Sequence, residues 1–165
     1  MAARCLPDDV RVDAEVRRVI SGKLLKLYFD FKLPRALRKD IRQVFARLRG
    51  TTIEKDVLEA LIERLTDPEG HVRQAAAEAL GQLGTAAATP EVMAALLKYL
   101  TDPERHVRQA AAEALRNLLA HVRPQERPEV MKLFLPLTRS RDADSREMGY
   151  VGLRNLLAGE HAEAA

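Results

Sequence analysis

Two stretches of this chain are almost identical, and their spacing restricts the possible folds more than any other feature. Residues 66–80 read TDPEGHVRQAAAEAL and residues 101–115 read TDPERHVRQAAAEAL, so fourteen of fifteen positions agree at an offset of 35 residues. Repetition with a period of about 20 to 50 residues is typical of stacked repeat architectures. One such repeat cannot bury both of its faces alone, so we expect neighbouring repeats to stack and share a core.

The segments before the two copies carry the apolar spacing of a helix. Five apolar residues in 57–65 recur in 92–100 at the same offset, and each set follows the i, i+1, i+4, i+5, i+8 pattern of one helical face. The two sets are Val57, Leu58, Leu61, Ile62 and Leu65, and Val92, Met93, Leu96, Leu97 and Leu100. Each repeat is therefore predicted to be an apolar first helix followed by an alanine-rich second helix.

Weaker copies extend the pattern in both directions. The sequence LRNLLA at 115–120 recurs at 153–158, and apolar residues in 24–48 fit one more unit. The chain is predicted to be all-α, a single α-solenoid domain of about four antiparallel helix pairs over 23–49, 53–84, 88–121 and 126–158. Residues 8–21 are expected to add an N-terminal helix. Gly81 and Gly84 are expected to end the second helix of the second pair, and Pro136 to kink or shorten the last turn of the helix that contains it.

The two central repeats also share an Asp placed six residues before an Arg that follows a Val. The residues are Asp67 with Val72 and Arg73, and Asp102 with Val107 and Arg108. With this motif the chain resembles HEAT repeats, in particular the short bacterial HEAT-like kind also seen in phycobilin lyase subunits. The resemblance is strongest over 53–121 and implies a helical superhelix in which such Asp and Arg residues form a ladder of hydrogen bonds between repeats.

The outer repeats depart from that motif. Lys32 and Ser140 stand where the aspartates are expected, although Arg38 and Arg146 remain. In the last repeat Asp142 or Asp144 is an alternative carboxylate. The ladder is therefore expected to be continuous only in the centre, and terminal repeats of such arrays are commonly atypical.

Charge and composition narrow the functional class. The net charge is +3, but residues 1–50 carry 13 basic and 6 acidic residues while the other 115 carry 14 and 18. No apolar run approaches the roughly 18 residues of a membrane span, and the N-terminal residues lack the apolar core of a signal peptide. The single cysteine, Cys5, cannot form an internal disulfide. We expect a cytoplasmic protein with no membrane association.

The repeated histidines and glutamates lack the partner residues that a metal site or a catalytic site needs. His71 and His106 occupy equivalent repeat positions, as do Glu78 and Glu113. No Cys, Asp or Glu completes a metal ligand set around the histidines, and no nucleophile or matching base accompanies the glutamates. The prediction is a non-enzymatic chain with no cofactor and no metal.

The resemblance places the second helices on the concave face of the array, where a partner would bind. Polar residues opposite the core of these helices are the predicted partner-binding set: Lys39, Gln43, Gln74, Glu78, Gln109, Glu113, Arg116, Tyr150 and Arg154. Mixed polarity of this kind suits a protein or peptide, and the leading interpretation is a protein-interaction scaffold. Two alternatives stay open: nucleic-acid binding through the basic residues of 35–49, and a bilin-lyase-like enzyme subunit.

Overall fold

All regular secondary structure in the described part of the chain is helical. The computed structural model describes residues 14–30, 40–41, 43 and 52–163. Seven α-helices lie in these ranges: α1 (Ala14–Tyr28), α3 (Thr52–Arg64), α4 (Gly70–Gln82), α5 (Pro90–Leu97), α6 (Arg105–Leu119), α7 (Arg127–Phe134) and α8 (Ala143–Glu163). No strand occurs in the same ranges, and the prediction of an all-α solenoid is confirmed.

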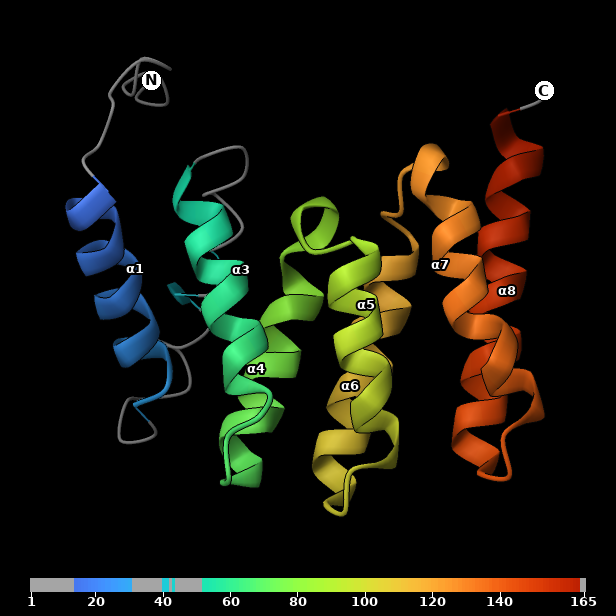
Figure 1. Cartoon of the computed structure of the whole chain (residues 1–165), viewed down its shortest axis with the longest axis horizontal. Helices are drawn as coiled ribbons and strands as arrows, with labels where there is room; N and C mark the ends of the chain where they lie inside the picture. The colour runs from blue at the N-terminus through green and yellow to red at the C-terminus, as the bar shows by residue number, and fades with distance from the viewer. Residues whose placement is uncertain (1–13, 31–39, 42, 44–51, 164–165) are drawn as a thin grey trace.

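The described helices stand side by side in a row, with α1 at one end and α8 at the other (Figure 1). In that view α3, α5 and α7 form a front layer, and α4, α6 and α8 form a second layer behind it. Helix α3 packs on α4, α5 on α6, and α7 on α8, while α6 also contacts both α4 and α8. Successive repeats are therefore connected through their second helices, and α5 also contacts α7.

Turn residues explain where the helices begin and end. The Thr89 hydroxyl accepts the Val92 amide at 3.4 Å and caps α5, whose first residue is Pro90. Asp67 Oδ1 accepts the Glu69 amide at 3.0 Å just before α4. Pro136 lies in the 3₁₀ segment Leu135–Arg139, directly after α7 ends at Phe134. The predicted shortening at Pro136 is thus confirmed, since proline cannot donate the next helical hydrogen bond.

Small residues let α4 and α6 approach closely. Ala76 and Ala111 are fully buried, and a Cβ added to Gly81 would lie 2.6 Å from the Cα of Ala114. The prediction that Gly81 helps to end α4 is wrong: Gly81 lies inside α4 and is buried against α6. Gly84, with a φ of 60°, makes the turn after α4. Larger side chains, among them Leu80, Leu115 and Phe134, complete the core.

The N-terminal part differs from expectation where the structure describes it. Helix α1 runs unbroken from Ala14 to Tyr28, across the boundary expected between a helix at 8–21 and the next at 23. No proline interrupts this stretch. The Tyr28 hydroxyl donates to the Ala75 carbonyl at 3.0 Å and ties α1 to α4. Lys39, Arg38 and the rest of the basic set expected in 35–49 lie outside the described residues.

Candidate functional site

One arginine in each of the last three repeats fastens the loop before its second helix. Nη1 of Arg73 donates to the carbonyls of Asp67 and Pro68 at 2.9 and 3.0 Å. Nη1 of Arg108 donates to the carbonyls of Asp102 and Pro103 at 2.8 and 3.1 Å. Nη1 of Arg146 repeats the arrangement on residues 140 and 141. Arg73 and Arg108 therefore both close the turns of their own repeats.

Arg73 also links two repeats through a carboxylate. Its Nε and Nη2 donate to Oδ2 and Oδ1 of Asp102 at 2.9 and 3.0 Å, and both residues are about nine-tenths buried. Burial alone raises the pKa of Asp102, but the bonds from Arg73 and from the Glu104 amide outweigh it and hold that pKa below its usual value. The expected ladder therefore exists between the second and third repeats as a bidentate, charge-assisted pair.

Arg108 has no equivalent carboxylate. The residue of the next repeat that corresponds to Asp102 is Ser140. The Oγ of Ser140 accepts the Asp142 amide at 3.2 Å. Asp142, the alternative carboxylate, accepts hydrogen bonds from the Ser145 hydroxyl and from the Ser145 amide at 2.7 Å, and these bonds lower the pKa of Asp142, with a smaller contribution from the charge of Arg108. Among described residues, neither Asp142 nor Asp144 forms an ion pair with Arg108. Among the described residues, the ladder therefore consists of the single pair between Arg73 and Asp102.

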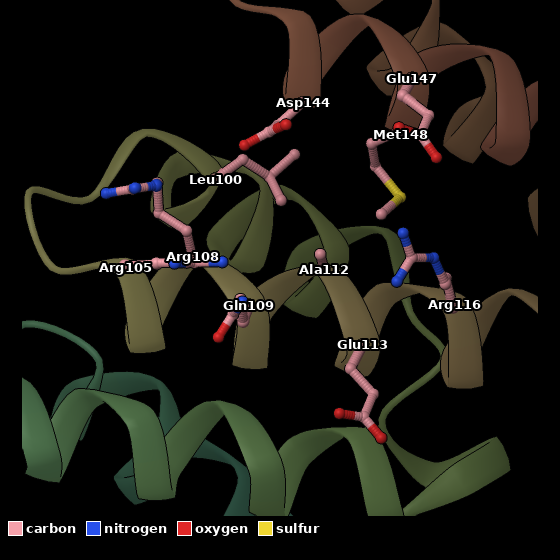
Figure 2. A pocket seen from close by; sticks show the side chains of 10 residues that line it. All are labelled: Leu100, Arg105, Arg108, Gln109, Ala112, Glu113, Arg116, Asp144, Glu147 and Met148. Carbon is pink, nitrogen blue, oxygen red and sulfur yellow. The ribbon is translucent and has the colours of Figure 1, made fainter.

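A groove opens between α6 and α8 where the ladder stops. Its volume is about 700 Å³, and Figure 2 shows side chains of α8 pointing toward α6 across it. The lining residues are Leu100, Arg105, Arg108, Gln109, Ala112, Glu113, Arg116, Asp144, Glu147 and Met148. A smaller recess of about 250 Å³ lies between α4 and α6, and Glu78 and Glu113 are among the residues that line it.

Comparison with known protein families shows to which family the chain belongs. The sequence model described as HEAT repeats matches residues 33–116, which is half of the chain. The chain belongs to the HEAT-repeat family. A search of curated proteins found no match.

Solved structures show the same fold at low sequence identity. An engineered protein from the Northeast Structural Genomics Consortium superimposes with a TM-score of 0.51 at 20% identity, over 83% of this chain and 62% of its own. A designed armadillo repeat protein in complex with the peptide (KR)4 gives 0.52 at 17% identity, over 81% and 62%. The HEAT-repeat chain thus spans less than two thirds of either protein.

The structure brings part of the predicted partner-binding set together. Gln109, Glu113 and Arg116 line the α6–α8 groove. Gln74 and Glu78 lie on α4 and hydrogen-bond each other at 2.8 Å. The other described members, Gln43, Tyr150 and Arg154, are exposed and do not line the groove, and Lys39 lies outside the described residues.

Sequence reasoning missed several lining residues of the groove. Arg105, Arg108, Asp144 and Met148 line the groove but are not in the predicted partner-binding set. The available signal in the sequence is Ser140, which stands where the last repeat is expected to have the ladder aspartate. A ladder arginine that lacks its aspartate keeps two hydrogen-bond donors unused. No group of three or more metal-binding side chains occurs among the described residues, and His71 and His106 lie near Glu69 and Glu104 at 2.8 and 2.9 Å.

Proposed function

We propose that this HEAT-repeat chain is a non-enzymatic scaffold that binds a protein segment or peptide on the face formed by α4, α6 and α8. The observation that carries the proposal is the open groove of about 700 Å³ between α6 and α8. A groove of this size between helices is a common place for a ligand. The solenoid fold is itself of a kind that serves as a protein-interaction scaffold.

The side chains in the groove support a polypeptide ligand. Gln109, Glu113 and Arg116 make no hydrogen bond or ion pair with other residues of the described part, so their polar groups are available to a partner. Ala112 adds a half-buried apolar position, and the buried Leu100 and Met148 lie at the base of the groove. Exposed polar groups of mixed charge suit a peptide, which offers both backbone amides and side chains. The structural neighbour that holds the peptide (KR)4 is consistent with this class of ligand.

The test uses peptides selected for binding rather than a known partner. Random twelve-residue peptides displayed on phage are selected on the purified chain, and the recovered sequences are synthesised with a fluorescent label. Fluorescence anisotropy then compares the wild type with a groove variant that carries Gln109→Ala, Glu113→Ala and Arg116→Ala.

A matched control removes the same kinds of side chain from another surface. The variant with Gln125→Ala, Glu129→Ala and Lys132→Ala changes exposed residues at and just before α7, none of which lines the groove. We expect the groove variant to weaken binding by at least about tenfold, the loss of one good polar contact, and the control to bind like the wild type. Failure to select any peptide, or equal binding by both variants and the wild type, would contradict the proposal.

A further inference from the structure

Arg108 lines the α6–α8 groove and lacks the carboxylate partner that the equivalent residue, Arg73, has in the preceding repeat. In the third repeat, Asp102 Oδ1 accepts both the Glu104 amide at 2.9 Å and Arg73 Nη2 at 3.0 Å, and Oδ2 accepts Arg73 Nε. In the fourth repeat, Ser140 Oγ accepts only the amide two residues ahead. The hydroxyl closes its own turn but supplies no carboxylate for the preceding arginine.

The guanidinium of Arg108 is nevertheless held like that of Arg73. In both residues Nη1 donates to the carbonyls six and five positions earlier, at distances between 2.8 and 3.1 Å. The other edge of Arg73, made by Nε and Nη2, takes the two oxygens of Asp102. In Arg108 this edge makes no hydrogen bond to another described residue, and the side chain lines the groove. A fixed guanidinium with two parallel donors is suited to a carboxylate.

We propose that the groove recognises an acidic peptide, and that one Asp or Glu side chain of this peptide binds Nε and Nη2 of Arg108 as Asp102 binds those of Arg73. The proposal rests on the proposed function and specifies its ligand. Arg105 supplies a second cation beside Arg108 in the groove (Figure 2). Asp144 and Glu147 of α8 line the opposite wall, so a single acidic residue placed at Arg108 is favoured over a run of acidic residues.

The first experiment tests whether binding requires a carboxylate in the peptide. Peptides selected on the wild type are expected to share an Asp or Glu at one position. Replacing that residue by Asn or Gln is expected to weaken binding by at least about tenfold, because a charge-assisted pair is lost. Selected peptides without an acidic position, or peptides that tolerate the amide, would overturn the inference.

The second experiment removes the proposed recognition group from the protein. Arg108→Ala is expected to cause the same loss of at least about tenfold, and Arg108→Lys to recover only part of it, because lysine keeps the charge without the paired donors. Lys132→Ala, an equal change of charge on α7, is expected to bind like the wild type. Circular dichroism of each variant shows whether it is folded under the assay conditions.

The third experiment completes the ladder from within the chain. Ser140→Asp places a carboxylate where the third repeat has Asp102, so the variant should pair Arg108 internally, melt at a higher temperature and lose binding of the selected peptides. If Arg108→Ala and Ser140→Asp both bind these peptides like the wild type while the triple groove variant does not, peptide binding stands and acidic recognition is wrong. If no peptide is selected at all, the proposed function fails with it.

Discussion

Arg73 and Arg108 occupy equivalent positions in neighbouring repeats, and they differ in what faces the outer edge of the guanidinium. Arg73 meets the buried carboxylate of Asp102, whereas Arg108 meets the open groove. Both keep the two bonds that close their own loops. The same residue type therefore stabilises the stack in one repeat and remains available to a ligand in the next.

This difference predicts unequal losses of stability. Arg73→Ala leaves Asp102 as a buried charge without its partner and is expected to lower the free energy of unfolding by about 3 kcal/mol. Arg108→Ala removes bonds to two carbonyls and is expected to cost about 1 kcal/mol. Gln109→Ala, at an exposed position, should change it by less than about 0.5 kcal/mol. Urea unfolding of the three variants measures the order, and an Arg108→Ala loss equal to that of Arg73→Ala would contradict it.

Asp102 also predicts how stability depends on pH. Its pKa is lowered in the folded chain: burial raises it, and the bonds from Arg73 and the Glu104 amide more than compensate. The pair therefore stabilises the fold fully above the unfolded value of about 3.9, and this stabilisation is lost as the pH falls through the lower folded pKa. In urea unfolding between pH 7 and 3, the stability difference between wild type and Asp102→Asn should stay constant down to about pH 4 and then begin to narrow. A difference that stays constant over the whole range would show that the carboxylate charge is not what stabilises the pair.

At the scale of helices, the repeat period and apolar spacing were sufficient to predict an all-α solenoid. Contacts between helices needed coordinates, because they depend on the closeness of two backbones rather than on a pattern within one helix. Gly81 illustrates this: its position near a helix end suggested a terminator, but its role is to admit Ala114. The groove was only partly predictable for the same reason, since Asp144 and Met148 enter it through the packing of α8 beside α6.

Two helical glycines provide a matched test of this packing. A Cβ added to Gly81 would meet the backbone of α6 at 2.6 Å, so Gly81→Ala is expected to destabilise the chain by about 1 to 3 kcal/mol. A Cβ added to Gly22, within α1, has nothing within 4 Å. Gly22→Ala should therefore stabilise by about 0.5 to 1 kcal/mol, because alanine loses less backbone freedom in a helix. Thermal unfolding of both variants checks the opposite signs, and a stabilising Gly81→Ala would contradict the close approach of α4 and α6.

Across the whole molecule, the interfaces between successive second helices are unequal. Helices α4 and α6 are joined by the Gly81–Ala114 contact and by the Arg73–Asp102 pair. Helices α6 and α8 are separated along part of their length by the groove and have no ladder pair. In a stacked array, stability is approximately the sum of repeat terms and nearest-neighbour interface terms. The repeat formed by α7 and α8 is therefore coupled to the rest more weakly than the two central repeats are to each other.

This inequality predicts that the last repeat opens before the centre. In native-state hydrogen exchange, amides in the middle of α8, from Met148 to Leu156, should exchange with a smaller free energy of opening than those of α4 and α6, because local units open independently where their interfaces are weak. Residues at the end of α8 are left out, since helix ends fray in any case. Ser140→Asp provides the control, because a carboxylate paired with Arg108 should raise the protection of α8 toward that of α6 without changing α4. Equal opening free energies for α4, α6 and α8 in the wild type would contradict this weak coupling and would mean that the contacts between α5 and α7 join the last repeat firmly to the preceding one.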